Sequence, residues 1–150
     1  MKKFSATVKF LACLTMIVGC ESAKWQSLPT PVGMLSDLPY PGDKEHGPDL
    51  DIIVVRKANA IILVNLTPRK IHDMQLWLNH EYVGLIDVIE IGNPAGRNRF
   101  LLNHFANQYH EAFPVGRFLT PDKGSMLVLA ELYNPATELR HRIRVQLDNG

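Results

Sequence analysis

The sequence predicts an all-β fold, and the architecture that it favours is a β-sandwich of about seven short strands. From residue 50 onward, short runs rich in β-branched and aromatic residues alternate with turn-forming residues. No stretch of helix length repeats apolar residues at the spacing of an amphipathic helix. A partly open β-barrel built from the same strands is the alternative.

Two β-branched runs begin the domain. They span residues 50–56 and 60–66, and Lys57-Ala58-Asn59 between them suits a short turn. Ile52-Ile53-Val54-Val55 places apolar side chains on both faces of the first strand. We therefore expect both faces of these strands to be covered.

A second pair of strands follows. Residues 74–79 alternate between apolar and polar, the run 82–91 comes soon after, and Asn79-His80-Glu81 marks a tight hairpin connection between them. Gly92-Asn93-Pro94-Ala95-Gly96 has the residues of a strong turn and ends this unit.

The strands after this unit are less evenly spaced. Short strands are expected at 100–102 and 118–119, a turn at 120–124, and a buried strand at 126–133. Asn134-Pro135-Ala136-Thr137 then forms a four-residue hairpin loop that leads into the last strand.

The last strand, 139–147, has the most regular alternation in the chain. One face, which we expect to be core, carries His141, Ile143, Val145 and Leu147. The other face carries Arg140, Arg142, Arg144 and Gln146. The three arginines could bind phosphate or carboxylate groups of a cell envelope. The alternative is a solvated edge strand whose charges oppose aggregation.

An alternating strand with a tryptophan near its centre, Met74-Gln75-Leu76-Trp77-Leu78-Asn79, resembles the third strand of immunoglobulin-like and fibronectin type III-like domains. In those families the tryptophan packs between the two sheets, and the resemblance implies the same position for Trp77. The chain lacks the cysteine pair that flanks this tryptophan in immunoglobulin domains. The resemblance therefore implies an architecture and no activity.

Residues 1–19 have the features of a secretory signal peptide. Lys2, Lys3 and Lys9 make the segment positively charged, and the apolar run 10–18 is too short to span a bilayer as a stable helix. We therefore leave residues 1–19 out of the folded domain.

The signal ends in Ile17-Val18-Gly19-Cys20, which resembles the lipobox of bacterial lipoproteins. The resemblance implies cleavage before Cys20 by signal peptidase II. It also implies a diacylglycerol on the Cys20 thiol and an acyl chain, such as palmitate, on its amino group. Three chains exceed what stable membrane anchoring needs. Because Glu21 is not the aspartate that retains some lipoproteins in the inner membrane, the resemblance favours the outer membrane, facing the periplasm, over the inner membrane.

Residues 20–48 are predicted to form a proline-rich, flexible tether between this anchor and a domain at 49–150. Half of the chain's 10 prolines lie in this segment, and proline restricts φ and removes a backbone donor. In the alternative, Trp25 and apolar pairs such as Met34-Leu35 dock on the domain.

Composition narrows the possible partners. The segment 1–19 contains three lysines and no acidic residue, so its removal changes the formal net charge from +1 to −2. A nearly neutral chain is not typical of a nucleic-acid binder, so we expect no nucleic-acid partner. Cleavage removes Cys13 and lipidation blocks Cys20, which leaves the mature domain without a thiol or a disulfide.

Motifs for catalysis and metal binding are missing from the sequence. It has no Gly-x-Ser-x-Gly elbow and no glycine-rich phosphate loop. Neither His80-Glu81 nor His110-Glu111 is followed by the second histidine of a zinc-peptidase motif. We therefore expect no enzyme, no cofactor and no metal site.

The segment 103–110 is a candidate binding loop, because it combines amides, imidazoles and aromatics, and long loops in compact domains are often functional. Its candidate ligand-binding residues, with His80, are Asn103, His104, Asn107, Tyr109 and His110. The leading hypothesis is nevertheless a lipid-anchored, non-catalytic envelope protein whose domain binds another envelope protein or acts as an accessory module. The alternative is a small-ligand module that binds a glycan or a metal through this loop.

Overall fold

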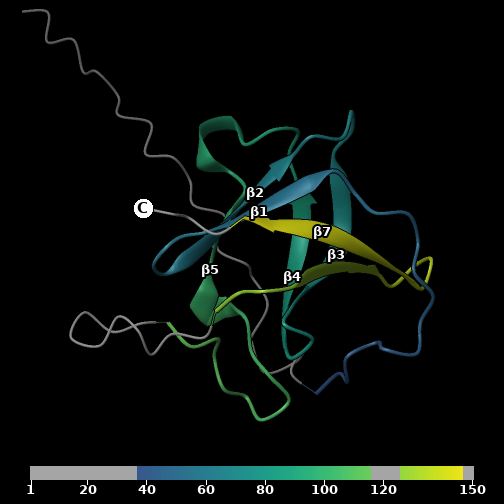
Figure 1. The fold of residues 1–150 in the computed structure, drawn as a ribbon, viewed down its shortest axis with the longest axis vertical. Coiled ribbons are helices and arrows are strands. Elements are labelled where there is room, and N and C mark those ends of the chain that lie inside the picture. The colour runs from purple at the N-terminus through teal and green to yellow at the C-terminus, as the bar shows by residue number, and fades with distance from the viewer. Residues whose placement is uncertain (1–36, 116–125, 147–150) are drawn as a thin grey trace, which may run out of the picture.

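The computed structural model describes residues 37–115 and 126–146, which form an all-β domain (Figure 1). Its strands are β1 (Ile52–Arg56), β2 (Ala60–Asn65), β3 (Ile71–Leu78), β4 (Tyr82–Ile89), β5 (Arg99–Leu101), β6 (Ala130–Asn134) and β7 (Leu139–Gln146). Two short 3-10 turns, η2 (Pro94–Gly96) and η3 (Leu102–His104), flank β5. In these described ranges no helix has the length and apolar character to cross a membrane. The predicted all-β fold is confirmed.

Several sequence predictions fall on residues outside the described ranges. They are the signal peptide and lipobox, the docking of Trp25 and Met34-Leu35, the short strand at 118–119, the turn at 120–124 and the facing of Leu147.

The strands form one mixed sheet in the order β4-β3-β6-β7-β1-β2-β5. Neighbouring strands are antiparallel except for β1 and β7, which are parallel. Strand β7 serves two partners, because Leu139–Ile143 pairs with β6 and Arg144–Gln146 pairs with β1. The sheet curls, so that β3 and β4 cross behind β1 and β7 in Figure 1. The sequence favours a β-sandwich, with a partly open barrel as the alternative, and the structure shows the strands in one mixed, curled sheet.

The position of β7 corrects one interpretation. Because β7 lies between β6 and β1, it is an inner strand, and the edge-strand explanation of its arginines is wrong.

Local turn chemistry is confirmed at two hairpins. Three residues, 79–81, connect Leu78 to its cross-strand partner Tyr82. Asn79 and His80 have φ of 53° and 62°, in the left-handed region typical of tight hairpin connections, and Glu81 N donates to Leu78 O at 3.1 Å. Between β1 and β2, Lys57 N donates to Ala60 O at 2.8 Å. Asparagine tolerates the left-handed region better than most residues, which explains its place in the β3–β4 turn.

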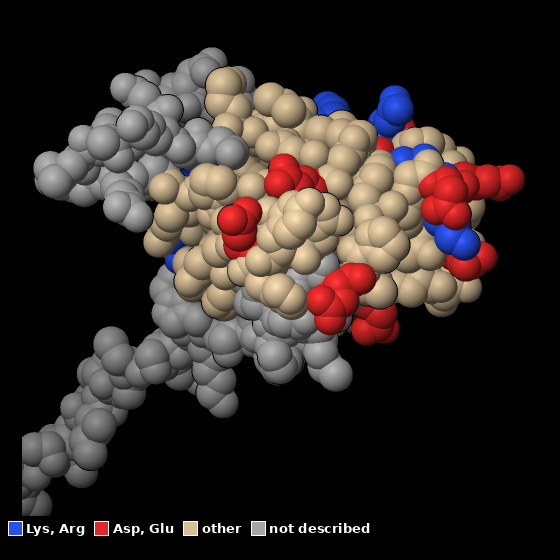
Figure 2. All heavy atoms as spheres, turned by 90° about the horizontal axis from the view of Figure 1, so that it is seen from below, with Lys and Arg blue, Asp and Glu red and all other residues tan. Residues whose placement is uncertain are grey.

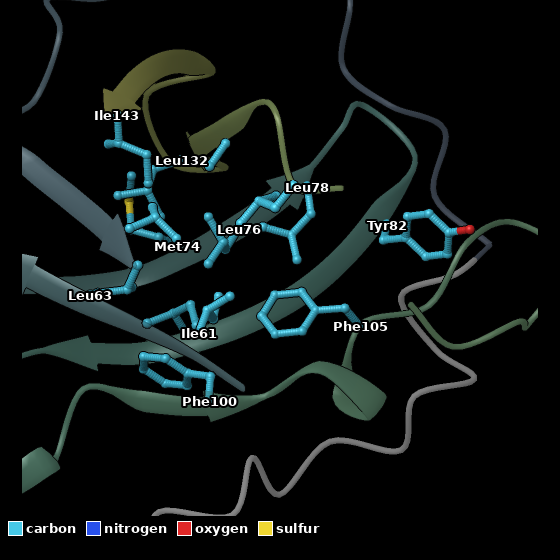
Figure 3. Packing of buried hydrophobic residues seen from close by; sticks show 14 of the residues in the cluster. Ile61, Leu63, Met74, Leu76, Leu78, Tyr82, Phe100, Phe105, Leu132 and Ile143 are labelled. Carbon is cyan, nitrogen blue, oxygen red and sulfur yellow. The ribbon is translucent and has the colours of Figure 1, made fainter. Parts of the chain in front are cut away.

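The core lies inside the curl and takes apolar side chains from all seven strands. In β3 the core-facing residues are Met74, Leu76 and Leu78. Phe105 points between the strands toward Ile61 and Leu76 (Figure 3), and all three are fully buried. Each such side chain stabilises the fold by about 1.5–3 kcal/mol through burial.

Two predictions about which faces are covered are wrong. Ile52 and Val54 of β1 face the core, but Ile53 and Val55 are only partly buried. Trp77 is buried on the face of β3 opposite to Met74, Leu76 and Leu78 and is not part of the core cluster. The immunoglobulin resemblance implies that Trp77 packs at the centre of the domain, and the structure does not place it there.

Residues 40–48, which we call the strap, lie along the first half of β7. Arg140 N donates to Glu45 O at 2.9 Å, and Gly47 N donates to Arg140 O at 2.8 Å. The His46–Arg140 pairing is parallel. The packed region therefore includes residues that the sequence assigns to the tether, whereas the predicted domain boundary lies at residue 49.

Candidate functional site

The candidate site is a group of polar side chains on the outer face of β3, β6 and β7, under and beside the strap. Its centre is Glu131 of β6, whose side chain is only 2% exposed. Register explains its surroundings, because Trp77 of β3 and Arg142 of β7 are its cross-strand partners. We call the following residues the Glu131 cluster: Tyr40, His46, His80, Glu131, Arg140 and Arg142.

Arg140 connects the strap to this cluster. Its Nε donates to Lys44 O at 2.9 Å, and its Nη2 donates to Gly42 O at 3.2 Å. Its Nη1 donates to the Tyr40 hydroxyl at 2.6 Å. These bonds, together with the backbone ladder, hold the strap against β7. Arg140 is therefore buried and not solvated, contrary to the predicted wet face.

The Tyr40 hydroxyl lies between Arg140 and Glu131 and hydrogen-bonds to both. It accepts from Arg140 and donates to Glu131 Oε2. Burial raises the pKa of Tyr40 to about 12, and the hydrogen bond and negative charge of Glu131 act in the same direction against the opposing effect of Arg140. Tyr40 thus stays protonated and acts as a hydrogen-bond donor at physiological pH.

Aromatic contacts fix Tyr40 from two further sides. Its ring meets the edge of Trp77 at a centroid distance of 5.4 Å and lies 4.3 Å from the His80 ring. Trp77 Nε1 in turn donates to Gln75 Oε1 at 3.2 Å. Trp77 is therefore buried outside the main core cluster and supports the site.

The second carboxylate oxygen of Glu131, Oε1, is differently placed. Its cationic neighbours are His46 Nε2 at 3.8 Å and Arg142 Nε at 3.9 Å, which is beyond hydrogen-bond distance. No hydrogen bond to Oε1 occurs within the described chain. In the described chain, every fully buried side-chain nitrogen or oxygen atom has a hydrogen-bond partner. Because Oε1 of Glu131 has no such partner, it is not fully buried and keeps some contact with solvent.

Partly exposed groups surround that oxygen. The side chains of His46, His80 and Arg142 are 37%, 48% and 62% exposed. His80 Nε2 lies 3.5 Å from Glu131 Oε2. The described residues contain no set of three or more histidine, cysteine and acidic side chains placed to hold a metal ion. The arrangement is thus a shielded carboxylate with hydrogen-bonding groups around it.

The predicted binding loop is organised by Asn107, which is buried. Its Oδ1 accepts from the backbone N of Tyr109 and Glu111 at 3.0 and 2.9 Å. Its Nδ2 donates to Glu111 Oε2 at 3.0 Å and to Glu81 Oε1 at 3.3 Å. The loop is attached to β4 by paired backbone bonds between Val83 and Ala106. Asn107 therefore has a structural role in shaping the loop.

The other residues of the predicted ligand site do not come together. Asn103 and Tyr109 are exposed, His104 is partly buried, and His110 Nε2 lies 3.5 Å from Asp37 Oδ1. His80 belongs to the Glu131 cluster. The structure thus places His80 in a different polar group from the one expected.

The three arginines of β7 also have separate roles. Arg140 is tied to the strap, Arg142 lies beside Glu131, and Arg144 donates from Nη2 to Asp51 Oδ1. Each is near a carboxylate. The row of three equivalent anion-binding groups predicted from alternation is therefore not what β7 presents.

Surface charge is sparse on the face shown in Figure 2. Acidic side chains are scattered over a largely uncharged surface, and Lys and Arg gather toward one end of this view. This face has no continuous basic stripe of the kind that follows a nucleic-acid backbone.

Comparison with protein-family models, with curated proteins and with solved structures finds no match to this chain. The interpretation of the Glu131 cluster therefore depends on its own geometry.

Sequence reasoning missed Tyr40, His46 and Glu131. For Glu131 a signal is present, because it is the single charged residue in the apolar run 127–132. Tyr40 and His46 lie among prolines and glycines, where no periodicity marks a residue as packed.

Proposed function

We propose that this chain is a lipid-anchored, non-catalytic binding module of the cell envelope, and that the Glu131 cluster is its binding surface. The observation that carries the proposal is a shielded carboxylate on the outer face of the sheet, away from the apolar core. Burying an ion costs several kcal/mol in desolvation. The apolar core does not include Glu131, so core packing does not explain why this carboxylate is buried. We therefore take Glu131 as the group that recognises a partner or ligand.

The lipobox at Ile17-Val18-Gly19-Cys20 supports the anchor. Because the strap is held against β7 from Tyr40 onward, the tether would run from Cys20 to residue 39. Extended at about 3.1 Å per residue, such a segment reaches at most about 60 Å. The domain could therefore meet partners at some distance from the membrane.

The chemistry of the cluster supports binding over catalysis. A general base or acid works best when its pKa lies near the working pH. The pKa of Tyr40, at about 12, is far above that range. Its hydroxyl is also used in a fixed chain from Arg140 to Glu131, which suits a positioning role.

We propose another envelope protein as the first candidate partner. A second candidate, a small polar ligand, is favoured by a specific observation, which is the solvent-reachable Glu131 Oε1 that accepts no hydrogen bond from the described chain. In either case the contact is expected at His46, His80 and Arg142, the partly exposed members of the cluster.

The proposal is tested by site-specific photocrosslinking of the full chain in a bacterium that processes lipoproteins. A photoreactive residue replaces Lys44, in the strap beside the cluster, or Arg97, after η2, as the matched control. Crosslinked species are expected from position 44 and not from position 97. Equal yields from both positions, or none from either, would overturn the proposed surface.

The anchor is tested in the same cells by palmitate labelling. The full chain should incorporate label, and the Cys20→Ser variant should not. Label that persists in the variant would contradict anchoring at Cys20.

A further inference from the structure

We propose that the Glu131 cluster binds a hydroxyl group of a neutral saccharide, held between Glu131 Oε1 and Arg142 Nε. This inference rests on the proposed function only in taking the cluster as the binding surface. It assigns the ligand class and the atoms that would recognise it.

The spacing of the two atoms suits a bridging oxygen. Glu131 Oε1 and Arg142 Nε are 3.9 Å apart, too far for a direct hydrogen bond. An oxygen at about 2.8 Å from each fits between them, with its two hydrogen bonds meeting near a right angle. His46 Nε2 is 3.8 Å from the same carboxylate oxygen.

The chemistry of the two atoms selects the bridging group. The carboxylate oxygen only accepts, and the guanidinium Nε–H only donates, so the group between them must do both. A hydroxyl donates its hydrogen to Oε1 and accepts from Nε–H with the same oxygen. A carboxylate or phosphate would meet the charge of Glu131, and an ammonium group would meet Arg140 and Arg142.

Further polar groups suit a ligand with several hydroxyls. His80 Nε2 lies 3.5 Å from Glu131 Oε2, the other oxygen of the carboxylate, and its imidazole makes no hydrogen bond within the described chain. A neighbouring hydroxyl on one sugar ring could therefore bond there. Saccharides present such adjacent hydroxyls.

The exposed surface of the cluster is polar, which suits a ligand with many hydroxyl groups. None of the large apolar residues exposed in the described chain belongs to the cluster. Trp77 is 3% exposed, so the ligand would be bound through hydrogen bonds.

The test is ligand-observed saturation-transfer NMR on the full chain, purified in a detergent without a sugar headgroup. The two probes are the trimer of N-acetylglucosamine and, separately, maltotriose, and buffer without sugar is the blank. Transfer to at least one probe is expected. Arg142→Ala should weaken it about tenfold or more, because a hydrogen bond to a charged group is lost. Glu131→Gln should weaken it as well.

The matched control is Arg144→Ala, which removes an exposed arginine from the same strand outside the cluster and should change binding less than about twofold. Because Glu131→Gln could disturb folding, circular dichroism accompanies each variant, and the exposed Arg142 keeps the test decisive. No transfer to either probe, or transfer unchanged in Arg142→Ala, overturns the inference. If the saccharide test fails but crosslinks from position 44 are still formed, the proposed binding surface stands and only the saccharide as ligand is wrong. The same conclusion follows if a protein is crosslinked at position 44 and neither saccharide binds.

Discussion

Replacing Arg140 with alanine tests whether the strap and the Glu131 cluster form one unit. The change removes hydrogen bonds to the Tyr40 hydroxyl, to Lys44 O and to Gly42 O. It also removes the guanidinium Nη1 that lies 3.6 Å from the shielded carboxylate of Glu131. Removing one partner of a buried ion pair costs about 3–5 kcal/mol. We expect the free energy of unfolding to fall by that amount.

The assay is urea denaturation of the full chain, with linear extrapolation of the unfolding free energy to water. Arg144→Ala is the control, because the side chains of Arg144 and Asp51 are 66% and 58% exposed and an exposed pair contributes about 0–1 kcal/mol. Adding Glu131→Gln to Arg140→Ala should recover part of the loss, since it removes the uncompensated charge. If Arg140→Ala costs no more than Arg144→Ala, the reasoning is refuted.

Three further predictions concern the core, a turn and a phenol. Gly84→Ala should lower the free energy of unfolding by about 1–3 kcal/mol through overpacking, because the new Cβ would lie 2.8 Å from the Phe105 ring. A loss below about 0.5 kcal/mol in urea denaturation would contradict this packing. Asn79→Ala should speed hydrogen exchange at the amide of Val128, which donates to Asn79 Oδ1 at 3.0 Å. Unchanged exchange would show that Asn79 does not hold the backbone at Val128. The pKa of Tyr40 is raised to about 12 in the folded chain from about 10 when unfolded. The contribution of Tyr40 to stability is therefore complete below about pH 10 and is lost as the pH rises to about 12. In an ultraviolet titration of the tyrosines, the Tyr40→Phe variant should lack the phase at the highest pH.

The strands and turns could be predicted because their signals are local. The β3–β4 hairpin depends on Asn79-His80, whose left-handed conformation is compatible with asparagine chemistry. The facing of Trp77 could also have been read from its strand. Trp77 shares a face with Gln75, whereas Met74, Leu76 and Leu78 form the apolar face that becomes core.

The candidate site could not be predicted in the same way. Arg140 is buried by Tyr40 and Gly42, which lie about a hundred residues away in sequence and have no periodic pattern. The alternation of β7 shows which side chains share a face, but it does not show that a strap covers part of that face. The burial of Glu131 follows from its register with Trp77 and Arg142, which is a property of the assembled sheet.

The most direct test of the central claim compares Arg142→Ala with Arg144→Ala in the crosslinking experiment. Both remove an exposed arginine from the same strand, and only Arg142 lies beside Glu131. With the photoreactive residue at position 44, the account predicts that Arg142→Ala abolishes the crosslinked species and that Arg144→Ala leaves its yield unchanged. Equal yields in the two variants would contradict the claim that the Glu131 cluster is the binding surface.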